Sequence, residues 1–131
     1  INHCFTCGHR LVDAEAKERC SACGAPLKKA GPLWVDDIYD TTTLRELIGL
    51  SEDRCRKLFE RAVEELGMPP TYYIPDRIAD DLEVSSPSPD KVVEALMEEG
   101  YRASRTAINP KGVKSDAPIS VIKILIQKLS A

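Results

Sequence analysis

Two short stretches, Cys4-Phe-Thr-Cys7-Gly8 and Cys20-Ser-Ala-Cys23-Gly24, decide how the first part of this chain folds. In each stretch two residues separate the cysteines, so a tight turn brings both sulfurs to one edge of a tetrahedron. The glycine after each pair lets backbone amides point at the sulfurs without a side chain in the way. Two such turns complete a closed site, which is typical of a structural zinc ion. We therefore predict that one zinc ion is bound by Cys4, Cys7, Cys20 and Cys23.

The predicted zinc-knuckle module covers residues 1–30, a segment with too few apolar residues to fold around a core of its own. In such modules metal binding supplies the folding free energy. Disulfides and free thiols are the alternatives, but the N-terminus lacks the basic and apolar regions of a secretory signal peptide. We therefore expect a reducing, cytoplasmic environment. The missing initiator Met leads us to expect that the chain is part of a longer protein.

The rest of the chain is predicted to be α-rich. Residues 31–40 have no helical period and are expected to form an extended connector, followed by an α-rich α+β domain at 41–131. The spacing of apolar residues predicts helices that begin near Thr42, Ser51, Pro75, Pro89 and Pro118. The expected caps are Thr42 or Thr43 for the first helix, Ser51 for the second, Ser88 for the fourth, and Ser115 or Asp116 for the last. The loose alternation from Tyr101 to Ile108 and the turn at 109–112 predict a strand that enters a hairpin or loop, and with it a small antiparallel sheet. A winged-helix relative is one interpretation of this order of elements.

Charge is unevenly distributed along the chain, whose net charge is -3. Lys and Arg outnumber Asp and Glu by five to three in residues 1–30 and by six to one in residues 100–131, whereas residues 31–99 carry seven against seventeen. A local basic patch attracts a phosphate backbone whatever the average charge. The alternative is an ordinary mixed surface, and charge alone does not decide between the two.

The stretch from Tyr101 to Pro118 is the candidate nucleic-acid interface. Guanidinium, ammonium and hydroxyl groups, together with helix N-termini, are the groups that hold phosphates in proteins. This stretch places such groups around a glycine turn and ahead of a helix start. We predict phosphate contacts from Arg102, Ser104, Arg105, Thr106, Lys111 and Lys114. A solvated hairpin with ordinary surface lysines is the alternative.

Several motifs, taken in order, resemble the C-terminal region of the tRNA (guanine(26)-N2)-dimethyltransferase family of archaea and eukaryotes. Besides the two cysteine pairs, the resemblance rests on Gly31-Pro-Leu-Trp34, Tyr72-Tyr73, the Ser-Pro linker at 85–89, Tyr101-Arg-Ala-Ser-Arg-Thr106 and Asn109-Pro-Lys-Gly-Val-Lys-Ser-Asp-Ala-Pro118. It covers essentially the whole chain. Two departures are Val35 after Trp34, where the family tends toward Gly, and Ala107, where a His is common.

The resemblance implies a full-length enzyme that uses S-adenosylmethionine to methylate the N2 atom of a guanine in tRNA. It implies that this chain is the C-terminal domain, which binds tRNA and packs on the N-terminal methyltransferase domain. The cofactor pocket and the catalytic Asp-Pro motif would lie in that other domain. We accordingly expect no catalytic residue in this chain, which has no glycine-rich cofactor loop after a strand. No apolar run is long enough to span a membrane.

Two other functional classes stay open. A zinc-ribbon and winged-helix DNA-binding regulator would need a basic recognition helix, but the helix after Pro89 has only Lys91 against four acidic residues. An interaction domain would use the acidic middle of the chain to bind a basic partner, without binding nucleic acid.

Overall fold

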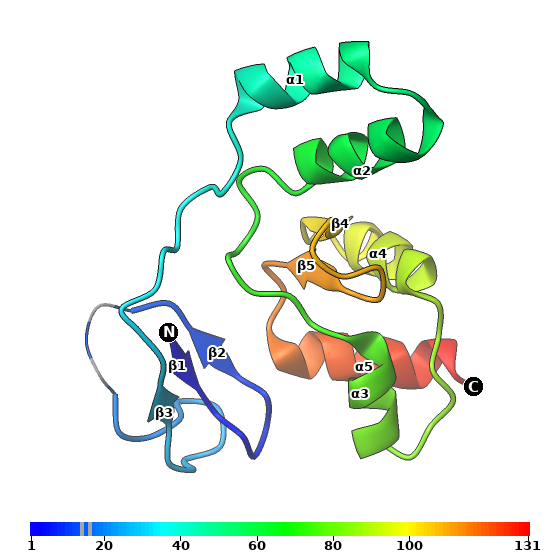
Figure 1. Ribbon diagram of the computed structural model, residues 1–131. Coiled ribbons are helices and arrows are strands. Elements are labelled where there is room, and N and C mark those ends of the chain that lie inside the picture. Colours follow the sequence, from blue (N-terminus) through cyan, green and yellow to red (C-terminus); the bar gives the residue numbers. More distant parts are fainter. Residues whose placement is uncertain (14, 16) are drawn as a thin grey trace. The chain divides into compact units, whose positions relative to one another are not determined.

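The computed structural model describes residues 1–13, 15 and 17–131. These residues form two compact units, which we call the N-terminal unit (residues 1–35) and the C-terminal unit (residues 36–131). Their junction falls within residues 31–40, the segment expected to be a connector. Among the described residues the elements are small antiparallel sheets and five helices, which confirms the predicted α+β class (Figure 1).

The N-terminal unit is built on a three-stranded antiparallel sheet with the strand order β2-β1-β3. Its strands are β1 (Asn2–His3), β2 (Arg10–Leu11) and β3 (Lys28–Lys29). On the central strand, His3 lies opposite Arg10 on one side and opposite Lys28 on the other. Directly opposite residues of antiparallel strands point to the same face. Arg10, His3 and Lys28 therefore form one row across a single face of the sheet.

The helices of the C-terminal unit begin close to the predicted positions, but the caps of α1, α2 and α5 are Asp40, Glu52 and Pro118 and not the residues expected. They are α1 (Thr41–Leu50), α2 (Asp53–Glu64), α3 (Pro75–Asp81), α4 (Pro89–Glu98) and α5 (Ile119–Leu129). Ser88 caps α4 by accepting a hydrogen bond from the Lys91 amide at 3.4 Å, as predicted. The cap of α1 is Asp40, whose carboxylate accepts from the Thr43 amide at 2.8 Å. No helix in the described part of the chain is long and apolar enough to cross a membrane.

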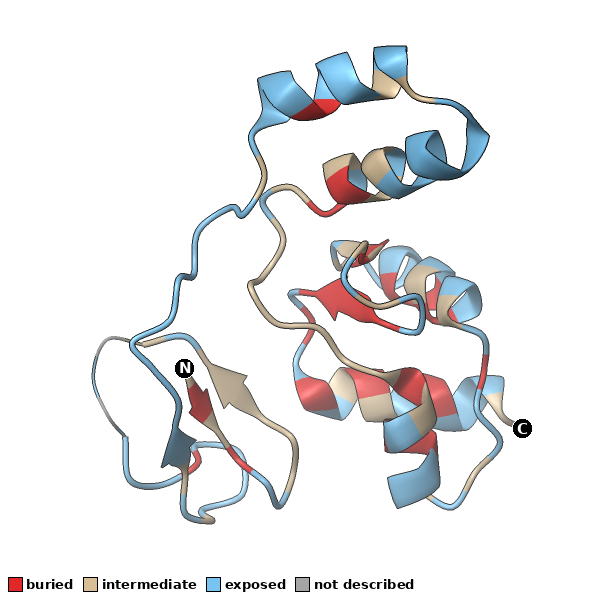
Figure 2. Cartoon of the chain, viewed as in Figure 1, coloured by how far each residue is buried: buried red, intermediate tan, exposed pale blue. Residues whose placement is uncertain are grey.

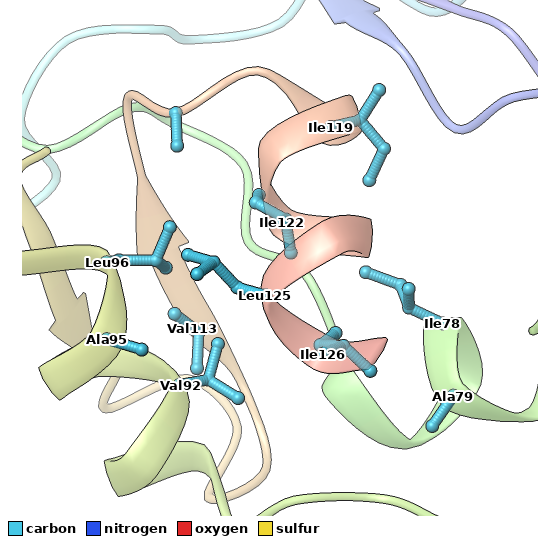
Figure 3. Close-up of a cluster of buried hydrophobic side chains, with 11 residues drawn as sticks. Ile78, Ala79, Val92, Ala95, Leu96, Val113, Ile119, Ile122, Leu125 and Ile126 are labelled. Atoms are coloured by element: carbon cyan, nitrogen blue, oxygen red, sulfur yellow. The ribbon is translucent and has the colours of Figure 1, made fainter. Parts of the chain in front are cut away.

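The core of the C-terminal unit lies between helices α3, α4 and α5 and a hairpin of two strands. The hairpin pairs β4 (Ala103–Arg105) with β5 (Val113–Ser115). Tyr73 adds one bridge to the hairpin, exchanging backbone hydrogen bonds of 2.8 and 2.9 Å with Val113. Figure 3 shows side chains from α3, α4, α5 and β5 meeting in this core: Ile78, Ala79, Val92, Ala95, Leu96, Val113, Ile119, Ile122, Leu125 and Ile126. The hairpin is thereby fixed on one side by buried apolar contacts.

Helices α1 and α2 pack on each other and contribute little to that core. Their buried residues are Leu44 in α1 and Ala62 in α2, and Figure 2 shows the remainder of the pair largely exposed. Leu50, at the end of α1, is 83% exposed, and Leu58 of α2 is also exposed. Between the two helices lies an apolar groove of about 360 Å³. The helical pair thus presents apolar surface that the C-terminal unit does not cover by itself.

Candidate metal centre and nucleic-acid interface

Both cysteine pairs lie on turns with the same backbone hydrogen bonds. In the first turn the Gly8 amide donates to the Cys4 carbonyl and the Cys4 amide donates to the His9 carbonyl, each at 2.9 Å. In the second turn the Gly24 amide donates to the Cys20 carbonyl at 2.8 Å. Gly8 and Gly24 have φ values of 83° and 74°, a conformation that residues with a side chain seldom adopt. The glycines are therefore needed for the shape of the turns.

The four sulfurs converge on one point. All of them lie within 4.8 Å of one another, with Cys4 Sγ 3.5 Å from Cys23 Sγ and Cys7 Sγ 3.7 Å from Cys20 Sγ. A disulfide would bring two sulfurs to about 2.05 Å, and these cysteines are free. Thiolates at about 2.3 Å from a tetrahedral zinc ion lie roughly 3.8 Å from each other. The observed separations fit such an ion and not a pair of disulfides.

The electrostatics of the cluster also favour a cation. A hydrogen bond from the Cys7 amide is the main reason that the pKa of Cys4 is lowered to about 6. Burial instead raises the pKa of Cys7 to about 12. Thiolates this close repel one another, so they cannot all be charged at neutral pH without a positive ion between them. A divalent metal ion is the group that would let all four lose their protons.

The structure divides the six residues predicted to contact phosphate into buried and exposed ones. Ser104, Thr106 and Lys114 are buried. Ser104 lies directly opposite Lys114 in the hairpin register, so both side chains point to the same face, opposite to the face on which Val113 packs in the core. The side chain of Arg105 is only 14% exposed, whereas those of Arg102 and Lys111 reach solvent. The clustering of charge in the sequence did not indicate this burial.

Every cation of the hairpin region has a carboxylate partner within the C-terminal unit. The pairs are Arg102 with Asp116 at 3.0 Å, Arg105 with Asp90 at 2.5 Å, Lys111 with Asp76 at 2.5 Å and Lys114 with Glu65 at 3.2 Å. The hydrogen bond from Lys111 lowers the pKa of Asp76, and the one from Arg102 lowers the pKa of Asp116. Because the charges cancel in pairs, this region attracts phosphate less strongly than its sequence suggests.

Glu65 is a structural residue that the sequence analysis missed. Its buried carboxylate accepts a hydrogen bond from the Ala107 amide at 3.1 Å and lies 3.2 Å from the Lys114 ammonium group. The Tyr39 hydroxyl also bonds to Glu65, and burial together with this bond raises the pKa of Tyr39 to about 12. Glu65 thus joins the segment before α1, the end of α2 and the hairpin. Its position seven residues after Leu58, on the apolar side of α2, is the signal that could have identified it.

Comparisons with known proteins point to one family. Residues 1–127 match the family model of N2,N2-dimethylguanosine tRNA methyltransferases. A tRNA (guanine(26)-N(2))-dimethyltransferase from Methanothermobacter thermautotrophicus is 37% identical over 137 residues, which cover 97% of this chain and 36% of the relative. The corresponding enzyme of Methanobrevibacter smithii is 32% identical over 142 residues, covering 100% of this chain and 37% of the relative. The chain therefore spans little more than a third of the length of these relatives.

A solved structure shares the fold. It is Trm1 from Pyrococcus horikoshii in complex with S-adenosyl-L-methionine, which matches with a TM-score of 0.64 over 82% of this chain and 33% of that chain. The two sequences are 24% identical over the match, so the likeness speaks for the fold alone.

Proposed function

Because this chain belongs to the family of N2,N2-dimethylguanosine tRNA methyltransferases, we propose that it is the zinc-containing, tRNA-binding C-terminal region of a tRNA (guanine-26-N2) dimethyltransferase. The observation that carries the proposal is the family match over residues 1–127. This match favours the methyltransferase over a DNA-binding regulator. S-adenosylmethionine and the catalytic residues belong to the part of the enzyme outside this chain, whose own sequence has no glycine-rich loop after a strand. With tRNA as substrate, we place the enzyme in the cytoplasm.

In this proposal the zinc ion is structural. Cys4, Cys7, Cys20 and Cys23 would hold it in a closed tetrahedron, and their separations of 3.5 and 3.7 Å support that assignment. With four sulfur ligands no coordination position is open to a substrate or a water molecule. The ion would hold the two turns together and so stabilise the small sheet of the N-terminal unit.

The hairpin region contributes to tRNA binding through its exposed cations. Arg102 and Lys111 reach solvent, and each can exchange an exposed carboxylate partner for a tRNA phosphate, because exposed ion pairs are weak. Arg105 instead holds the turn in shape, since it also donates to the Pro110 carbonyl. Ser104, Thr106 and Lys114 are buried and would support the hairpin from within. The proposed phosphate contacts are thus fewer than the sequence suggested.

The N-terminal methyltransferase domain of the same enzyme is the proposed partner of the α1–α2 pair. The relatives are nearly three times as long as this chain, so part of its surface is expected to become interior in the whole enzyme. The apolar groove and the exposed Leu50 and Leu58 fit such an interface. Leu50→Glu leaves the core untouched and should weaken binding of this chain to the separately produced N-terminal domain. Unchanged affinity would place the interface elsewhere.

The decisive experiment is binding of the purified, zinc-loaded chain to tRNA across a salt titration, with duplex DNA as competitor. We expect binding that weakens with salt and that duplex DNA does not displace at equal concentration. Preference for duplex DNA would favour the regulator. Absence of binding to either nucleic acid would show that this region does not bind tRNA by itself.

A further inference from the structure

The N-terminal unit carries exposed cations that the described part of the chain does not neutralise. Lys28 and Lys29 form strand β3, and both are exposed. Among residues 1–13, 15 and 17–131 neither of them forms an ion pair, whereas each cation of the hairpin region has a carboxylate partner. An unpaired surface cation can neutralise a phosphate without first giving up a protein partner. Because its lysines are unpaired among the described residues, β3 is better suited to bind a polyanion than the hairpin region is.

An exposed aromatic ring lies beside Lys28. Phe5 is the residue after the first metal-binding cysteine, and it is 73% exposed. Its ring meets the His3 ring edge to face, with centroids 4.5 Å apart and an interplanar angle of 85°. The Lys28 ammonium group lies 5.6 Å from the centroid of the Phe5 ring. The ring is thus oriented by two neighbours and by the turn that carries Cys4 and Cys7, yet most of its surface faces solvent.

The sheet register places further cationic and aromatic side chains next to Phe5 and Lys28. Arg10, His3 and Lys28 occupy one row across β2, β1 and β3, and Phe5 contacts the His3 and Lys28 members of that row. Cations that flank an aromatic ring are the combination with which proteins bind single-stranded nucleic acid, because the ring stacks on a base while the cations follow the backbone. We call the four residues His3, Phe5, Arg10 and Lys28 the ribbon surface.

We propose that the ribbon surface is an RNA-binding site, in which Phe5 stacks on an unpaired base and Lys28 neutralises an adjacent phosphate. The inference rests on the proposed function, since tRNA is then the RNA. Proteins read RNA mainly at unpaired bases, where a ring face is accessible to an aromatic side chain. The loops and single-stranded 3′ end of a tRNA supply such bases. This surface is separate from the hairpin region, which carries the phosphate contacts under the proposed function.

The test compares matched variants of the zinc-loaded, full 131-residue chain for binding to an unmodified tRNA transcript at several salt concentrations. Phe5→Ala should weaken binding about tenfold, the effect of losing one stacked base, whereas Phe5→Tyr retains the ring and the affinity. Lys28→Gln should lower the affinity and should reduce the magnitude of the slope of log K against log salt by about one, the effect of losing one phosphate contact. Lys57→Gln is the matched control, because Lys57 is an exposed lysine of α2 outside the ribbon surface and the hairpin region, and this variant should keep the affinity and the salt slope of the wild-type chain. Metal content is measured for each variant.

The outcomes separate this inference from the proposed function. If the wild-type chain binds tRNA and neither Phe5→Ala nor Lys28→Gln changes the binding, the ribbon surface is not an RNA site, while the proposed function stands. If the wild-type chain does not bind tRNA, this inference is overturned together with the tRNA-binding part of the proposed function, while the family membership stands. Should Phe5→Ala lose its zinc, Lys28→Gln decides, because Lys28 lies outside the metal-binding turns. An unchanged salt slope in that variant overturns the inference.

Discussion

Replacing Lys114 with methionine removes the positive charge opposite Glu65 and keeps a side chain of similar length. The two side chains are 5% and 1% exposed, and the ammonium group lies 3.2 Å from the carboxylate. In Lys114→Met the carboxylate stays buried and still accepts from the Ala107 amide and the Tyr39 hydroxyl, but it has no counter-charge. Removing one partner of a buried pair costs about 3–5 kcal/mol. We expect a loss near the lower end, about 3 kcal/mol, because these two donors remain.

A double-mutant cycle shows whether the pair itself carries this energy. Glu65→Gln alone leaves the Lys114 ammonium group buried without a counter-charge, and it should also destabilise the fold. In Lys114→Met/Glu65→Gln neither charge remains, and the glutamine carbonyl can still accept from the Ala107 amide. The double variant should therefore lose less stability than the sum of the single losses, by about 1–3 kcal/mol.

Urea unfolding at neutral pH, followed by circular dichroism, measures these differences. Lys111→Met is the matched control, because the pair of Lys111 with Asp76 is exposed and should contribute little. Strictly additive single losses, or a loss in Lys114→Met no larger than that in Lys111→Met, would refute the reasoning. A folded Lys114→Met protein should also keep the salt dependence of tRNA binding, whereas a slope reduced by about one would identify Lys114 as a direct phosphate contact.

Three further predictions concern packing, metal and acid. A Cβ atom on Gly112 would lie 2.5 and 2.9 Å from side-chain carbons, so Gly112→Ala should lower the unfolding free energy by about 1–3 kcal/mol. Gly49→Ala, within α1 and with nothing within 4 Å, should raise it by about 0.5–1 kcal/mol. Adding a chelator should unfold the N-terminal unit, so that in an NMR spectrum its dispersed amide resonances disappear while those of α4 and α5 remain. Dispersed resonances that survive in both units would contradict a structural zinc ion. The pKa values of Asp76 and Asp116 are lowered in the folded protein, so their charged forms stabilise the fold above the ordinary pKa of 3.8. This stability is lost as the pH falls through the lowered values. In Asp116→Asn the unfolding free energy should therefore decrease less steeply as the pH is lowered.

Features set by neighbouring residues could be predicted from the sequence. The turns at Cys4 and Cys20 follow from the spacing of two sulfurs and a glycine, which is a local constraint. The start of α4 follows from Ser88 and from Pro89, whose fixed φ suits a first helical position. The beginning of α1 was harder to predict, because hydroxyl and carboxylate residues follow one another there and Asp40 is the one that accepts the hydrogen bond.

Features set by distant residues could not be predicted from the pattern. Lys114 and Glu65 are 49 positions apart, and only the folded hairpin brings them to 3.2 Å. The sequence shows a run of cations after residue 100, but not which of them strand alternation turns inward. Lys114 shares one face of the hairpin with Ser104, and it is buried because that face is turned toward Glu65. Three of the carboxylates that neutralise the run, Glu65, Asp76 and Asp90, come from other parts of the chain, which a count of charges along the sequence does not reveal.

The sparse burial of the α1–α2 pair has a consequence for how the C-terminal unit opens. A segment held by few apolar contacts reaches an open state at a lower free energy than the segments that form the core. With Leu44 and Ala62 as its buried residues, the pair is expected to unfold locally while α4, α5 and the hairpin stay closed. Its amide hydrogens would then exchange with solvent in a faster class than those around Val92 and Ile126. In the complete enzyme, a domain resting on the pair would slow this exchange, because contacts that exist only in the closed state oppose opening.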